Sequence, residues 1–169
     1  MNVVNKLINN MIDYYQNDTR RINHFLKVYS YANIIAENEK VDQSIKEIIE
    51  ISSILHDIGI KKSEEKYNSS AGHYQEIEGP PIAKDMMEKH NISEEIIERV
   101  CFLIGNHHTY TRIDGMDYQI LIEADFIVNI DSEKMNKSQI KNIKEKIFKT
   151  NHGIKLLDLL FNWSLDYGA

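Results

Sequence analysis

The chain contains few of the residues that break helices or cross-link chains. Its 169 residues include one cysteine, two prolines and seven glycines. A single cysteine can form neither an intramolecular disulfide nor a cysteine-rich zinc cluster, so nothing requires an oxidising compartment. The scarcity of proline and glycine, beside 42% hydrophobic and 27% charged residues, excludes collagen-like, repeat-array and disordered chains. It indicates helices joined by short turns.

Positive charge is in deficit, and long apolar runs are missing. There are 20 lysines and arginines against 26 aspartates and glutamates, a formal net charge of −6. This is the wrong sign for a protein that binds long nucleic acid through its phosphates, although a small nucleotide stays compatible. Polar residues interrupt every apolar run near the N-terminus, so we predict no signal peptide, no membrane span and a cytoplasmic protein.

Apolar residues recur at three- and four-residue spacing along most of the chain, and no stretch alternates as a strand would. We therefore predict one all-α domain over residues 1–169, a bundle of about seven to eight helices. The predicted helices cover about 4–17, 19–36, 42–58, 80–90, 93–104, 117–128, 138–148 and 152–164. The C-terminal helices, within 135–165, are expected to pack on the rest.

Between residues 61 and 79 the periodicity is lost, and serine and glycine accumulate. We predict a long loop here, which could include a short helical turn. Residues 62–79 would be long enough to form a substrate-selecting lid. Pro80 and Pro81 suit the first turn of the next helix, where a missing N–H costs little.

Four ionisable residues lie where apolar stripes should continue: His24, His56, Asp57 and Asp125. Burying imidazole and carboxylate groups is costly unless they pair or bind a metal. Any one of them alone would be read as a satisfied core residue or a helix cap, but four together favour a metal site. Two imidazoles and two carboxylates suit Mn²⁺, Fe, Zn²⁺, Ni²⁺ or Co²⁺.

Four segments, in this order, resemble the H…HD…H…D signature of the HD-domain metal-dependent phosphohydrolases. They are Arg21–Ala32, Ile54–Gly59, Asn106–His108 and Glu123–Phe126. The resemblance covers about residues 18–130 and implies a small stand-alone HD hydrolase with the HD helical bundle. It also implies that His24, His56, Asp57 and Asp125 are the metal ligands, and that a metal-bound water attacks phosphorus.

Other residues can be given roles in such a site. Asp57 could orient or deprotonate the water with its second oxygen. Charge developing on the phosphoryl oxygens calls for nearby cations, of which Lys61 is the first candidate, followed by Arg20 and Arg21. His107 and His108 are candidates for catalysis, for substrate binding or for a second metal.

The number of metal ions is the next question. In family members with two ions, the second is held by histidines from the region of His107 and His108 together with a residue near 73–78. Here Gln75 stands where the family histidine is expected, although His73 or Glu76 could substitute as second-metal or substrate ligands. We therefore expect one ion in preference to two.

We predict an enzyme that hydrolyses a small phosphate ester, above all a phosphomonoester such as a nucleotide. Two alternatives stay open. One is a non-catalytic sensor of metal or nucleotide, and the other is an HD-type di-iron oxygenase, which Gln75 disfavours. The apolar terminal helices also suggest a homodimer, as does the resemblance to a family in which dimers are common.

Overall fold

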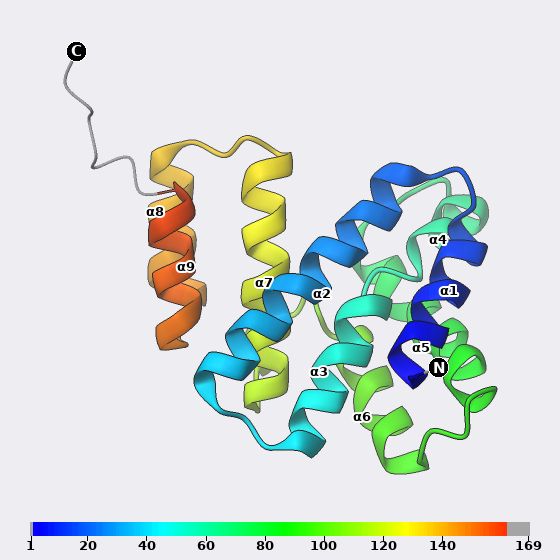
Figure 1. Ribbon diagram of the computed structural model, residues 1–169. Coiled ribbons are helices and arrows are strands. Elements are labelled where there is room, and N and C mark those ends of the chain that lie inside the picture. Colours follow the sequence, from blue (N-terminus) through cyan, green and yellow to red (C-terminus); the bar gives the residue numbers. More distant parts are fainter. Residues whose placement is uncertain (1, 162–169) are drawn as a thin grey trace.

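The computed structural model describes residues 2–161, and these residues form an all-α bundle, as the periodicity predicted. The helices are α1 (Val3–Tyr15), α2 (Thr19–Glu39), α3 (Gln43–Leu55), α4 (Ile60–Tyr67), α5 (Gly72–Glu88), α6 (Glu94–Ile104), α7 (Met116–Ser132), α8 (Lys137–Ile147) and α9 (Asn151–Phe161), with a 3₁₀ turn η1 at Tyr110–Arg112. In Figure 1, α2 crosses the middle of the molecule. Helices α7, α8 and α9 lie on one side of it, and α1, α4, α5 and α6 lie on the other.

Helix α2 connects two hydrophobic clusters. Its N-terminus is fixed by Asp18, whose carboxylate accepts a hydrogen bond from the Arg21 backbone N–H at 3.1 Å. One cluster packs buried residues of α2 and α3 against α7, α8 and α9, and the other packs them against α1, α5 and α6. Because α2 is buried on both sides, the polar His24 is held between these two cores.

The segment expected to be a loop, residues 61–79, is mostly helical, so that prediction was wrong. Helix α4 ends at Asn68, which adopts the left-handed conformation, and only residues 68–71 separate α4 from α5. The two helices are joined by Glu78, which accepts hydrogen bonds from Lys66 Nζ at 2.8 Å and from the Tyr67 hydroxyl at 2.7 Å. A long flexible lid over residues 62–79 is therefore not present.

Gly59, which follows the predicted third helix, and Gly79, which was placed in the predicted loop, are points of close helix packing. A Cβ atom on Gly59 would lie 2.6 Å from the carbonyl oxygen of Gln75 and 2.7 Å from the backbone nitrogen of Gly79. Contacts this short to backbone atoms leave no room for a side chain. The turn before α4 can therefore approach the middle of α5 because Gly59 has no side chain. A Cβ atom on Gly79 would instead lie 2.7 Å from Cγ2 of Ile104, so this glycine allows α6 to pack closely on α5.

Pro80 and Pro81 do not begin a helix, contrary to the prediction. They lie inside α5, which starts at Gly72 and runs on to Glu88. A proline in a helix interior removes one backbone hydrogen bond and is usually avoided. The local preference of two prolines is thus overridden here by tertiary packing, since Gly79, Ala83, Met86 and Met87 of the same helix are buried.

The C-terminal helices α8 and α9 pack on α2 and α7. The buried carboxylate of Glu123 in α7 ties this region together, because it accepts hydrogen bonds from the backbone N–H groups of Lys149 at 2.6 Å and Thr150 at 2.9 Å. Residues 162–165 of the predicted C-terminal region lie outside the described residues. Over residues 2–161, none of the helices has both the length and the apolar character needed to cross a bilayer.

Candidate metal centre

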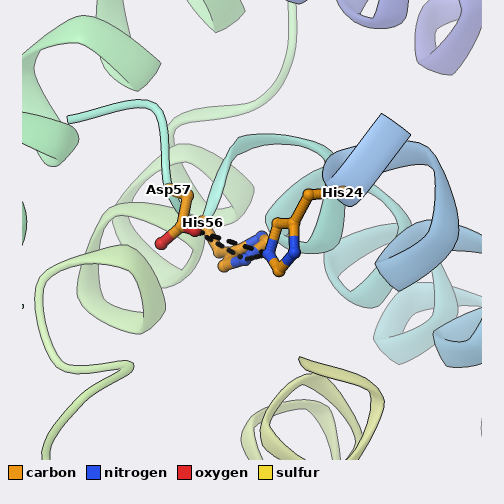
Figure 2. Close-up of side chains that lie close together, drawn as sticks. All are labelled: His24, His56 and Asp57. Carbon is orange, nitrogen blue, oxygen red and sulfur yellow. Dashed lines mark hydrogen bonds and ion pairs between the residues drawn. The ribbon is translucent and has the colours of Figure 1, made fainter. Parts of the chain in front are cut away.

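Three helices bring the four predicted ligands together. His24 projects from the second turn of α2, His56 and Asp57 directly follow the last residue of α3, and Asp125 lies in the middle of α7. Helix α2 packs against both α3 and α7. Figure 2 shows the ring of His24 beside the turn that carries His56 and Asp57.

The ligand atoms of these four residues converge. The Nε2 atom of His24 lies 3.1 Å from Nε2 of His56 and 3.4 Å from Oδ2 of Asp57. It lies 3.2 Å from Oδ1 of Asp125. His56 Nε2 is 3.5 Å from each of the same two carboxylate oxygens. Two nitrogens and two oxygens from distant parts of the sequence thus share one small volume.

Hydrogen bonds to backbone carbonyls set the orientation of two histidine rings. His56 Nδ1 lies 2.9 Å from the carbonyl oxygen of Ser53, and His107 Nδ1 lies 2.7 Å from that of Ile104. A carbonyl oxygen can only accept, so Nδ1 carries the proton in both rings and Nε2 faces the site. His107 Nε2 points at the second oxygen of Asp57, Oδ1, at a distance of 3.0 Å.

The charges in the cluster favour the ionised form of both aspartates and the protonated form of His56. Burial opposes ionisation of Asp57 and Asp125, yet the neighbouring histidines hold the pKa of both carboxyl groups well below the usual range. Burial likewise lowers the pKa of His56, but Asp57 and Asp125 outweigh it and raise that pKa to about 9. The charges of the cluster therefore suit a cation.

One atom tests whether these residues fit a metal ion. Oδ1 of Asp125 is buried and has no hydrogen-bond donor within the part of the chain that the structure describes. Leaving a buried carboxylate oxygen without a donor is unfavourable, whereas a divalent ion at this point would satisfy it. The mixed nitrogen and oxygen set suits Mn²⁺, Fe, Ni²⁺, Co²⁺ or Zn²⁺, so the residues fit the implied ion.

His107 and His108 form a second group with Asp57. One possible ligand atom from each of these three residues lies within 4.8 Å of the others. His107 is buried and His108 is half-buried, and their ring centroids are 4.0 Å apart. His107 and His108 therefore lie next to the four candidate ligands, and Asp57 belongs to both groups.

His108 is restrained by the first turn of α5. Its backbone N–H donates to Glu76 Oε1 at 3.0 Å, and its Nε2 lies 3.3 Å from Gln75 Oε1. The amide nitrogen of Gln75 donates to the carbonyl oxygen of Ser70 at 2.6 Å, so its oxygen is the atom that faces His108. His108 Nε2 is then the donor in that contact. Burial and the neighbouring His107 lower the pKa of His108 to about 4, so the ring is neutral at neutral pH.

Two predicted residues lie away from the ligand cluster. Lys61 donates to the carbonyl oxygen of Tyr14 at 3.0 Å, and its Nζ lies 5.0 Å from the Tyr14 ring. His73 is exposed, with its ring 3.8 Å from that of Tyr74. Glu76 is close, but it accepts hydrogen bonds from the His108 backbone and the Thr109 hydroxyl, so it positions the segment that carries the histidines.

A cavity of about 690 Å³ opens beside the cluster. Its lining includes the candidate ligands His24, Asp57 and Asp125, and His108. The predicted phosphate-binding residues Arg20 and Arg21 also line it, whereas Lys61 does not. Arg21 is already paired, with Asp18 at 3.0 Å and Glu64 at 2.6 Å.

Several polar residues of the cavity were missed at the sequence level: Asn23, Lys27, Ser70, Asn129, Ser132 and Glu133. Helical spacing could have identified some of them. Lys27 follows His24 by three residues on α2, and Asn129 follows Asp125 by four on α7, so each shares a helix face with a ligand. No comparable signal pointed to Ser70, because residues 68–71 were predicted to be part of a longer loop.

The comparisons with known proteins identify the family of the chain. The HD domain family model matches residues 21–149, so the chain belongs to the HD domain family. A crystal structure of a predicted HD superfamily hydrolase from an uncultured Thermotogales bacterium is similar in fold. It has a TM-score of 0.67 and 18% sequence identity, and the match covers 98% of this chain and 86% of that chain. No match was found among the curated proteins.

Proposed function

We propose that the protein is a metal-dependent phosphohydrolase that acts on a small phosphate monoester, above all a nucleotide. The main support is the convergence of four ligand atoms, including the unpartnered Oδ1 of Asp125, at the wall of a cavity that is also lined by arginine. Membership of the HD domain family supports a metal-dependent hydrolase.

The residues suggest how hydrolysis would proceed. An ion held by His24, His56, Asp57 and Asp125 would lower the pKa of a water molecule and polarise a phosphoryl oxygen. Oδ2 of Asp57 lies 3.4 Å from His24 Nε2, which leaves Oδ1, beside His107, as the oxygen that would accept a proton from the attacking water. His108 stays neutral and holds its place through Gln75, so it positions groups and does not supply a proton.

This proposal can be tested by measuring phosphate release from a panel of monoesters by the full-length protein. We expect release in the presence of Mn²⁺ or another divalent transition ion, its loss after treatment with a chelator, and its recovery when the ion is returned. A protein that holds about one equivalent of metal but releases no phosphate from any ester would contradict hydrolysis. That result would favour the sensor.

We propose that one ion is bound. His108 belongs to the second group of potential ligands, with Asp57 and His107, but its Nε2 atom is engaged by the carboxamide oxygen of Gln75. The substitution Gln75→His removes this amide and adds a nitrogen ligand beside Asp57, His107 and His108. Elemental analysis is expected to give a metal-to-protein ratio near one for the parent protein and near two for the variant. A ratio near two in the parent would refute the one-ion proposal and restore the di-iron oxygenase as a candidate.

Arg20 is proposed to contact the substrate phosphate. It lies one helical turn before His24 and lines the cavity, and it makes no ion pair within residues 2–161. Arg20→Ala is expected to raise KM for every phosphate ester by about tenfold, since one charge-assisted hydrogen bond is lost. Steady-state kinetics would measure this change. Equal KM values in the parent and the variant would show that Arg20 does not bind phosphate.

A further inference from the structure

The turn that carries the candidate ligands His56 and Asp57 lies between two helices and belongs to neither. It covers residues 56–59, after the end of α3 and before the start of α4. Within the turn, the backbone N–H of Ile60 donates to the carbonyl oxygen of Asp57 at 3.1 Å. A turn of this length has few backbone hydrogen bonds of its own, so contacts from other elements contribute to its position.

The N-terminal helix α1 makes such a contact through its last residue, Tyr15. The hydroxyl of Tyr15 donates to the carbonyl oxygen of Asp57 at 3.0 Å, and the carbonyl oxygen of Ile58 lies 3.4 Å from the same hydroxyl. A carbonyl oxygen can only accept, so Tyr15 is the donor. Tyr15 is only 3% exposed, and its ring centroid lies 5.3 Å from that of Phe25 in α2. Packing therefore fixes the ring that carries this hydroxyl.

A second hydrogen bond joins α1 to the other side of the turn. Lys61, in the first turn of α4, donates from Nζ to the carbonyl oxygen of Tyr14 at 3.0 Å. This carbonyl lies in the last turn of α1, where a helix has no backbone donor left to offer it. The end of α1 is thus bonded to the chain before and after Gly59. Lys61, which does not line the cavity, has a place here as part of the support of the turn.

Asp57 is the candidate ligand that depends most on this support. Its Oδ2 lies 3.4 Å from His24 Nε2, and its Oδ1 lies 3.0 Å from His107 Nε2, so a displacement of its backbone moves both oxygens away from their partners. Asp125, in contrast, projects from the middle of α7, and the ring of His56 is held by a carbonyl of α3. The hydroxyl of Tyr15 is the contact from α1 that acts on the backbone of Asp57 itself.

We infer that Tyr15 is a positioning residue of the metal centre, whose hydroxyl holds the backbone of Asp57 so that the carboxylate is directed at the ion. This inference rests on the metal centre of the proposed function and extends that centre to α1. The helix precedes residue 21, where the match to the HD domain family begins, so the contact does not follow from membership of the family.

The test measures binding of Mn²⁺ to the full-length Tyr15→Phe protein by isothermal titration calorimetry. The variant keeps the ring and its packing and loses only the hydroxyl. Loss of a group that orients a ligand costs about 10- to 100-fold in metal affinity or activity, so we expect Kd to rise by about tenfold or more. At saturating Mn²⁺, kcat for an ester that the parent hydrolyses should fall by about tenfold. KM should change less than threefold, because Tyr15 does not line the cavity.

Two controls separate the hydroxyl from the packing of α1. Tyr14→Phe removes a hydroxyl from the neighbouring residue, and within residues 2–161 this hydroxyl makes no hydrogen bond to the turn. Val4→Ala removes buried methyl groups from the first turn of α1 and so weakens the packing of the helix without touching Tyr15. Both controls should keep the Kd for Mn²⁺ within about threefold of the parent value, and circular dichroism should show that all three variants are folded.

An unchanged Kd in Tyr15→Phe would overturn the inference. So would an equal rise in either control, because the hydroxyl would then have no effect of its own. A parent protein that binds none of Mn²⁺, Ni²⁺ and Co²⁺ would overturn both the inference and the metal centre. If Tyr15→Phe weakens Mn²⁺ binding as expected while the parent hydrolyses no ester, the role of Tyr15 stands and the proposed phosphohydrolase fails.

Discussion

Replacing Asp57 with alanine is expected to remove both the bound metal and the activity. One oxygen of Asp57 lies 3.4 Å from His24 Nε2, and the other lies 3.0 Å from His107 Nε2, so the substitution removes a ligand and the proposed proton acceptor together. Loss of a group that only supports a ligand already costs 10- to 100-fold in metal affinity or activity, so loss of the ligand should exceed about 100-fold. Elemental analysis should find about one equivalent of metal in the parent and almost none in the variant.

The control for this experiment is Asp85→Ala, which removes an exposed carboxylate from α5. It should keep both the metal and the activity. Circular dichroism of the Asp57→Ala protein should retain its helical signal, because the three helices that carry the candidate ligands, α2, α3 and α7, are held by the two hydrophobic clusters. A folded Asp57→Ala protein that still contains a full equivalent of metal would show that the ion is bound elsewhere.

The substitution Gly59→Ala is expected to destabilise the fold by about 3 kcal/mol, at the upper end of the cost of overpacking. The new methyl group would lie 2.6 Å from a carbonyl oxygen and 2.7 Å from a backbone nitrogen of α5, and backbone atoms cannot turn aside as a side chain does. The φ angle of Gly59, −74°, is ordinary for alanine, so the cost is steric. Urea unfolding followed by circular dichroism would measure it.

Gly105→Ala is the matched comparison, since this glycine also lies directly beside a helix and has an ordinary φ of −73°. The nearest atom to its added methyl group would be 3.2 Å away, so a small adjustment can accommodate it. We expect a loss below about 1 kcal/mol. Equal unfolding free energies for the two variants would mean that the contact between Gly59 and α5 is not as tight as the structure indicates.

The ligand cluster could be predicted from the sequence because its residues break a pattern. His24 and Asp125 interrupt apolar stripes, and such interruptions are costly unless the polar groups meet. The fold class followed from the same stripes. In both cases the signal is local periodicity, which one sequence records directly.

The residues from 61 to 79 could not be predicted in the same way. Glycine and serine usually mark loops, but Gly79 lies inside α5, where an added Cβ atom would be 2.7 Å from Cγ2 of Ile104, and this depends on a tertiary contact. The position of Lys61 was missed for a related reason. Its place next to the ligand pair in sequence suggested the site, whereas the turn into α4 brings its ammonium group to Tyr14.

The two carbonyl contacts of His56 and His107 have a wider consequence for how such a centre can arise. Each ring bonds to the carbonyl three residues earlier, at the end of α3 and of α6, where the last carbonyls of a helix lack partners within it. The tautomer of each ring is therefore set by the end of the helix that precedes it, and no distant residue is needed. Residues around these two histidines, including those that would contact a substrate, can therefore be substituted while the Nε2 lone pairs keep their direction.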